Sequence, residues 1–122
     1  MSLRQKVDAL NQQILDGDIL GAFEKYYAEE VVMSDNNVDH RVGKERNREH
    51  EKQFVGGITA FHGAELKNLA VHETAPGTGT AFAEWSMRFD HAAYGDDTHL
   101  QQVAVQEWED GQIVRERFYY GS

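Results

Sequence analysis

The second half of the chain alternates between long extended segments and tight turns, and this pattern constrains the fold more than any other feature. Four segments suit β-strands, at residues 60–74, 80–93, 98–109 and 112–120, and the turns between them read APGTG, YGDD and EDG. Strands joined by such short turns pair as an antiparallel meander. These segments exceed the usual strand length of about five or six residues, so we expect the sheet to twist and bend strongly.

The first half carries helical patterns instead. Apolar residues recur at helical spacing in residues 2–15, and Ser2 with Gln5 three positions on has the form of a capping box. Gly17 is a plausible stop for this helix, and Asp18 is a plausible N-cap for a second one. The second helix would bury Ile19, Ala22, Phe23, Tyr26 and Tyr27.

A short strand and a third helix complete the first half. Residues 31–35 are β-branched at their start and suit a strand, and the turn-rich DNNVDHRVG that follows suits a hairpin or an exposed loop. Residues 44–55 suit a highly charged helix that ends at two glycines, with Asn47, His50 and Phe54 on its inward stripe. Three helices ahead of a bent sheet indicate the α+β class, and we expect one domain over residues 1–122.

Composition excludes several function classes. The 122 residues carry a formal net charge of −9, with no cluster of basic residues to offset it, so nucleic-acid binding by backbone neutralisation is not expected. The absence of cysteine excludes disulfides, thiolate catalysis and cysteine-based zinc sites. Neither a signal peptide nor a membrane span is evident, and we expect a cytoplasmic protein.

Three stretches resemble one known family. The sequence DGDILGAFEKYYAEEVVMSD resembles an opening in which a Gly-Asp corner leads into a helix, a Tyr-Ala-acid-acid step and a strand ending in aspartate. VGKERNREHEKQF resembles a glycine-led third helix, and WEDGQIVRERFYYG resembles a terminal hairpin. These features are similar to those of the SnoaL-like or NTF2-like superfamily. The resemblance implies a cone in which three N-terminal helices pack in a strongly curved, mostly antiparallel sheet. It says little about function, because this fold hosts many activities.

Ketosteroid isomerases of that superfamily allow a comparison residue by residue. They use an aspartate base opposite a tyrosine and a protonated aspartate that bind the oxyanion. The resemblance places Asp35 at the base, Leu10 at or beside the oxyanion tyrosine, and Ala104 at the protonated aspartate. The base position is kept and both oxyanion donors are missing, so steroid isomerisation of the usual kind is not expected. SnoaL-type cyclases use a histidine and an aspartate, which makes His50 with Asp35 the nearest analogue.

Each candidate has a structural alternative. Asp35 could be a general base whose pKa is raised beside an apolar cavity, or simply the first residue of a turn with Asn36. His50 could transfer a proton near neutral pH, or be a buried histidine bonded to Asn47 or to a strand. No group of residues has the sequence spacing of a metal site, and we expect neither a metal nor another cofactor.

The resemblance also suggests a pocket lined by further residues. The expected ligand-pocket residues are Tyr26, Asn47, Phe54, Gln102, Gln106, Phe118 and Tyr120. Strand 80–93 has one apolar face and one face bearing Glu84 and Arg88, and the sequence leaves open which face lines the pocket. The other face is expected to form a homodimer, as in sheet-to-sheet dimers of this superfamily.

The sequence therefore favours a pocket for a small, largely apolar organic molecule. If the protein is an enzyme, Asp35 and His50 would perform cofactor-free proton transfer in an isomerisation, a cyclisation or a water addition. The alternative is a non-catalytic ligand-binding or dimerisation module of the same fold. No membrane and no nucleic acid is expected as a partner.

Overall fold

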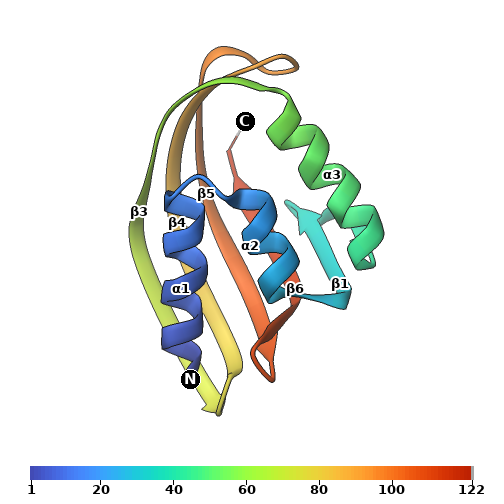
Figure 1. Cartoon of the computed structure of the whole chain (residues 1–122), viewed down its shortest axis with the longest axis vertical. Coiled ribbons are helices and arrows are strands. Elements are labelled where there is room, and N and C mark those ends of the chain that lie inside the picture. Colours follow the sequence, from blue (N-terminus) through green and yellow to red (C-terminus); the bar gives the residue numbers. More distant parts are fainter. Residues whose placement is uncertain (122) are drawn as a thin grey trace.

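The structure, a computed structural model, describes residues 1–121, which form three helices and six strands. Their order is α1 (Leu3–Leu15), α2 (Ile19–Tyr26), β1 (Tyr27–Asp35), β2 (Val38–Val42), α3 (Lys44–Gly56), β3 (Ile58–Ala75), β4 (Thr78–His91), β5 (Gly95–Glu109) and β6 (Gln112–Tyr120). The helices lie on one side of a curved sheet that bends around them (Figure 1). The α+β class predicted from the sequence is confirmed.

Side-chain caps fix where the two N-terminal helices begin. The Ser2 hydroxyl accepts a hydrogen bond from the Gln5 amide at 3.2 Å, and the Gln5 side chain accepts one from the Ser2 amide at 2.8 Å. This confirms the predicted capping box. Asp18 accepts a hydrogen bond from the Gly21 amide at 3.0 Å and caps α2 as predicted. Such caps satisfy amides that have no partner inside the helix.

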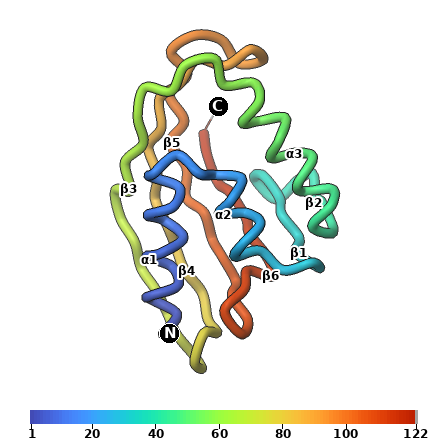
Figure 2. Tube along the Cα trace, in the orientation of Figure 1, coloured from blue at the N-terminus to red at the C-terminus, as the bar shows by residue number. Residues whose placement is uncertain are grey.

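The six strands form one sheet in the order β2-β1-β6-β5-β4-β3. Strand β6 lies between β1 and β5, so the last strand of the chain runs through the middle of the sheet (Figure 2). Pairing of β1 with β6 is parallel, and the other pairs are antiparallel. Of the two possibilities for DNNVDHRVG, the hairpin is the one that forms, with Asn36 and Asn37 at φ 51° and 63° in its turn.

The inner face of β4 and β5 is the face that packs against the helices. On β4 the apolar face is buried, comprising Ala81, Ala83, Trp85, Met87 and Phe89. On β5 the matching residues are Gln102 beside Trp85 and Ala104 beside Ala83. The question left open by the sequence is thus decided, because Glu84 and Arg88 lie on the outer face.

The junction between α3 and β3 packs closely against the end of β4. His91 is 5% exposed; its Nε2 donates to the Phe54 carbonyl at 2.9 Å and its Nδ1 accepts from the Ala93 amide at 3.0 Å. A Cβ atom on Gly57 would lie 2.4 Å from the His91 ring. Gly57 therefore leaves room for this imidazole, which in turn fixes the last turn of α3.

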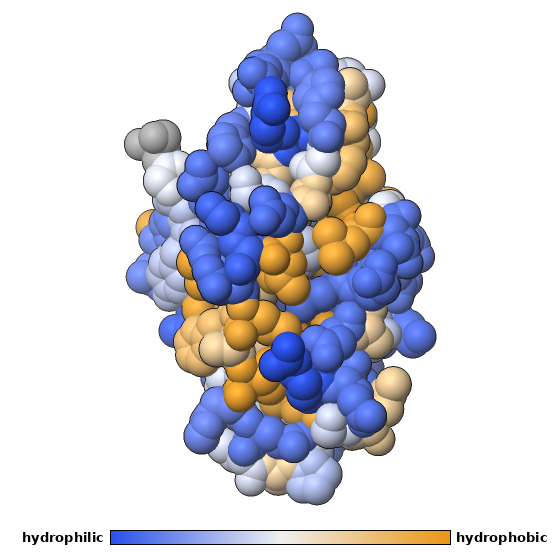
Figure 3. Space-filling model, turned by 90° about the vertical axis from the view of Figure 1, so that its left-hand side faces the viewer, coloured by the Kyte–Doolittle hydropathy of each residue, from blue (hydrophilic) through white to orange (hydrophobic). Residues whose placement is uncertain are grey.

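The surface on the side of β3 and α1 is hydrophilic at its ends and has hydrophobic residues gathered across its middle (Figure 3). Helix α1 is held to the β3–β4 hairpin by Glu73, whose carboxylate accepts hydrogen bonds from the Leu3 amide at 2.6 Å and the Gly77 amide at 3.2 Å. Among the described residues, the helices are all too short or too polar to cross a membrane.

Candidate functional site: a cavity between the helices and the sheet

A cavity of about 510 Å³ lies between the helices and the inner face of the sheet. Apolar side chains from both layers form much of its lining, among them Leu10, Phe23, Phe54, Trp85, Phe89 and Phe118. The lining residues Tyr94 and His99 near the β4–β5 turn are exposed, whereas Phe23 and Tyr27 are buried, so the cavity opens at the β4–β5 end. Its volume falls within the range of about 300–1,000 Å³ that is usual for small-molecule sites.

A carboxyl group is buried at the deep end of this cavity. Glu116 on β6 is 2% exposed, and the Tyr27 hydroxyl is in hydrogen-bonding contact with its Oε1. Gln106 Nε2 donates to Glu116 Oε2 at 2.7 Å, and Trp108 Nε1 donates to Gln106 Oε1 at 3.1 Å. Adjacent strands position the group, because Gln106 on β5 is the register partner of Glu116.

The groups around Glu116 have opposite effects on its pKa. The pKa of Glu116 is raised to about 7, mainly by burial; the hydrogen bonds from Tyr27 and Gln106 lower it in part, and the charge of nearby Asp35 adds to the rise. Burial and the adjacent Glu116 raise the pKa of the Tyr27 hydroxyl well above its ordinary value. Tyr27 therefore keeps its hydrogen near neutral pH, while Glu116 is present in both protonation states.

Helix α3 contributes two titratable groups to the same wall. Glu51 is partly accessible because it borders the cavity, yet burial, followed by the charge of Glu116, raises its pKa to about 7. Burial and then the Arg41 guanidinium lower the pKa of His50, so its imidazole is neutral at pH 7. His50 Nδ1 is buried with no hydrogen-bond partner in the described part of the chain.

Asp35, at the end of β1, lies near His50 and is paired with Arg41. The guanidinium Nη1 is 3.1 Å from Asp35 Oδ2 and 2.8 Å from Asp39 Oδ2, and its Nε donates to Asn47 Oδ1 at 3.2 Å. The hydrogen bond from Arg41 holds the pKa of Asp39 below its usual range. Arg41 is 2% exposed, so the β1–β2 hairpin is built around a buried cation.

One set of side chains has the composition of a metal site. Ligand atoms of Asp35, Asp39 and His50 lie within 4.8 Å of one another. The Arg41 guanidinium, however, already contacts both carboxylates, and it supplies the positive charge that a cation would bring. The residues present therefore fit an internal ion pair better than a metal.

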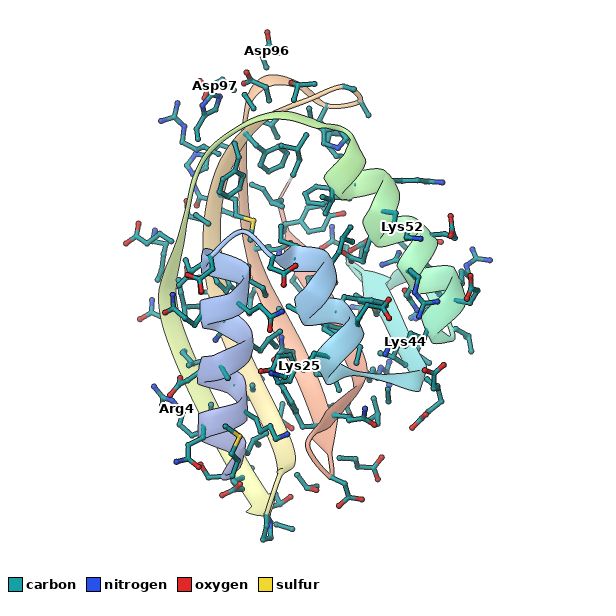
Figure 4. The ribbon with its side chains drawn as sticks, in the orientation of Figure 1. Arg4, Lys25, Lys44, Lys52, Asp96 and Asp97 are labelled. Atoms are coloured by element: carbon teal, nitrogen blue, oxygen red, sulfur yellow. The ribbon has the colours of Figure 1, made fainter. Side chains whose placement is uncertain are left out.

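Two acidic residues lie near the mouth of the cavity, and one of them, Asp97, is paired with Arg88 at 2.6 Å. Asp96 and Asp97 lie at the tip of the β4–β5 connection (Figure 4), between the lining residues Tyr94 and Thr98. Lys44 and Lys52 belong to α3, and neither lines the cavity.

Most residues proposed from the sequence lie around this cavity. Its lining includes Asp35, His50, Phe54, Gln102, Gln106, Phe118 and Tyr120. Tyr26 does not line it; its ring packs edge-on against Trp108 in the core, 6.2 Å between centroids. Asn47 does not line it either, because its amide donates to the Arg41 and Gly43 carbonyls, both at 2.9 Å.

The polar lining residues that were not among the candidates include four in the interior of the cavity: Tyr27, Arg41, Glu51 and Glu116. Sequence patterns could have found two of them. Glu116 shares strand parity with Phe118 and Tyr120, and Glu51 is one turn beyond Asn47 on the helical stripe. No comparable pattern separates Tyr27 from Tyr26, because the chain changes from helix to strand between them.

Comparison with known families settles the membership of the chain. The family model of the SnoaL-like domain matches residues 3–116. The chain belongs to the SnoaL-like family. The resemblance stated from the sequence is thereby confirmed, and among curated proteins no relative was found.

Solved structures with the same NTF2-like fold include several bacterial proteins. A candidate polyketide cyclase from Pseudomonas putida is 22% identical, with a TM-score of 0.76 over 99% of this chain and 92% of its own. A candidate isomerase from Bacillus subtilis is 20% identical, with a TM-score of 0.76 over 99% and 90%. A candidate SnoaL-like polyketide cyclase from Mesorhizobium loti is 20% identical, with a TM-score of 0.75 over 98% and 100%. At these identities the likeness shows the fold alone.

Proposed function

We propose that the cavity of this SnoaL-like protein binds a small, largely apolar organic molecule, and that its polar wall moves a proton on that molecule without a cofactor. The reaction would be an isomerisation, a cyclisation or a water addition. The observation that carries the proposal is a largely apolar cavity whose lining brings Asp35, His50, Glu51 and Glu116 close together. Two of the similar structures are likewise described as a candidate isomerase and a candidate polyketide cyclase.

Glu51 is the group best suited to take the proton from the ligand. Its pKa is raised to about 7, and a general base works best when its pKa is close to the working pH. No hydrogen bond contributes to the pKa shift of Glu51, whereas Asp35 is paired with Arg41 at 3.1 Å. Asp35 with His50, the pair proposed from the sequence, is the competing assignment.

Isotope exchange tests this assignment without knowledge of the natural substrate. The probe is 1-tetralone in D₂O, and proton NMR follows the loss of signal from the hydrogens on the carbon beside its carbonyl. We expect the wild-type protein to accelerate exchange and Glu51→Gln to lower the rate by about 10²–10⁴-fold, the usual contribution of a general base. Asp35→Asn is expected to keep most of the rate.

The matched control is Glu49→Gln, which removes an exposed glutamate from the same helix and should not alter the rate. A rate that survives Glu51→Gln but is lost in Asp35→Asn would assign the base to Asp35. Binding of 1-tetralone without any accelerated exchange in the wild-type protein would favour the alternative, a non-catalytic binding module.

A further inference from the structure

The hydrogen bonds behind the cavity have a fixed direction. An indole N–H can only donate, so the oxygen of the Gln106 amide must face Trp108, at 3.1 Å. The Gln106 NH₂ group must then face Glu116, and it donates to Oε2 at 2.7 Å. Oε2 of Glu116 therefore accepts a hydrogen bond from Gln106 whether Glu116 is neutral or ionised.

The hydrogen bond from Gln106 to Oε2 determines which oxygen of Glu116 carries the proton when the group is neutral. Because Oε2 accepts from Gln106, the proton belongs on Oε1, the oxygen in contact with the Tyr27 hydroxyl. An ionised Glu116 accepts the only hydrogen that Tyr27 can donate. A neutral Glu116 instead donates to the Tyr27 oxygen, and the Tyr27 hydroxyl can then donate its hydrogen to another acceptor.

We propose that Tyr27 and neutral Glu116 form a binding subsite for a carbonyl oxygen of the ligand, and that occupation of this subsite is linked to uptake of one proton by Glu116. Tyr27 and Glu116 both line the cavity, so a ligand oxygen can meet the freed hydroxyl hydrogen there. The proton comes from solvent and no covalent bond changes. The inference rests on the ligand-binding part of the proposed function and is independent of proton transfer to Glu51.

Charges on each packed element support a neutral Glu116 in the bound state. The charge of Asp35 on β1 disfavours ionisation of Glu116, and an ionised Glu116 in turn disfavours ionisation of Glu51 on α3. The cation of Arg41 on β2 is engaged by Asp35 and Asp39, while His50 on α3 is neutral at pH 7. Gln106 on β5 carries no charge. The subsite therefore offers a hydrogen to an acceptor oxygen and repels a carboxylate.

Paired ligands separate this contact from apolar burial. Binding of 1-tetralone and of tetralin, the same skeleton without the oxygen, is titrated by NMR between pH 5.5 and 8.5. We expect 1-tetralone to bind at least about tenfold tighter below pH 7, the value of one good hydrogen bond to a buried donor. The affinity of 1-tetralone relative to tetralin, called its advantage below, should fall by up to about tenfold per pH unit above pH 7, because Glu116 ionises. Tetralin binding should not depend on pH.

Two substitutions should have opposite effects on the advantage of 1-tetralone over tetralin at high pH. Tyr27→Phe removes the donor, so the advantage of 1-tetralone should disappear at every pH while tetralin binding is kept. Glu116→Gln presents its amide oxygen to Gln106 and its NH₂ group to Tyr27, which reproduces the hydrogen pattern of neutral Glu116. The advantage of 1-tetralone should therefore persist at pH 8.5 in Glu116→Gln.

The proposal is overturned if Glu116→Gln loses the advantage as Tyr27→Phe does, or if the advantage in the wild-type protein grows with pH. Equal binding of both compounds to the wild-type protein at every pH would also overturn it, as would failure of both to bind, which would remove the ligand-binding function as well. Loss of isotope exchange with the pH-dependent advantage intact would refute only the proton-transfer function.

Discussion

Glu116 is a carboxyl group whose protonation is set by neighbours on three different elements. Desolvation raises its pKa to about 7, against an ordinary value of 4.5. The folded state therefore holds the Glu116 proton more tightly than the unfolded state does. It follows that the stabilising effect of this proton is fully present below pH 4.5 and is lost as pH rises to about 7.

This linkage gives a prediction for stability. The free energy of unfolding should fall by up to about 3 kcal/mol between pH 4.5 and pH 7.5 through Glu116, since a tenfold difference in proton affinity between the folded and unfolded states is worth about 1.4 kcal/mol. Glu116→Gln should flatten this part of the curve, with urea denaturation at each pH as the measurement. An unchanged slope in Glu116→Gln would show that Glu116 titrates at its ordinary pKa. Glu65→Gln, an exposed carboxyl on β3, is the control.

Residue-scale prediction succeeded where one element alone decides the direction of a side chain. The helical stripe predicted for α3 put His50 and Phe54 on its inward side, and both line the cavity. It failed where two elements meet: Tyr27 depends on where α2 ends and β1 begins. Arg41 gives no signal from the sequence, because its burial depends on Asp35, Asp39 and Asn47 closing around it.

At the scale of elements, the contact between α3 and β4 depends on one glycine. Gly57→Ala would place a methyl group 2.4 Å from the buried His91 ring and break its bonds to Phe54 and Ala93. We expect a loss of about 1–3 kcal/mol in stability, as for other overpacked sites, measured by thermal and urea denaturation. Gly56→Ala is the matched control, because no atom lies within 4 Å of its added Cβ. Equal effects of the two substitutions would contradict this account.

Sequence patterns predicted the elements better than their pairing. Caps at Ser2 and Asp18 and the apolar stripes fix three helices, and the turns fix the meander of β3 to β6. Parallel pairing of β1 with β6 joins segments far apart in the chain, and no local pattern encodes it. The cavity wall depends on this pairing, since it brings Tyr27 to Glu116, and so the polar core of the site was missed.

At the scale of the whole molecule, the outer face of the sheet is the surface that the predicted homodimer would use. Phe82 on this face is 44% exposed, beside its register partner Val105. If the protein is a dimer through this face, Phe82→Glu should yield monomers, as measured by light scattering after size-exclusion chromatography. Phe61→Glu, a 48%-exposed aromatic on the edge strand β3, should leave the dimer intact. A monomeric wild-type protein at tens of micromolar would refute the dimer.

The central position of β6 has a consequence for folding kinetics. Tyr27 and Glu116 are 89 residues apart in sequence, and β1 gains its second neighbour only when β6 docks. Closing so long a loop is an entropic barrier that local helix and hairpin formation does not lower. We therefore expect the β3–β5 meander to form first and the β1–β6 ladder to be the slow step. During synthesis, the site would be completed only after β6 has left the ribosome.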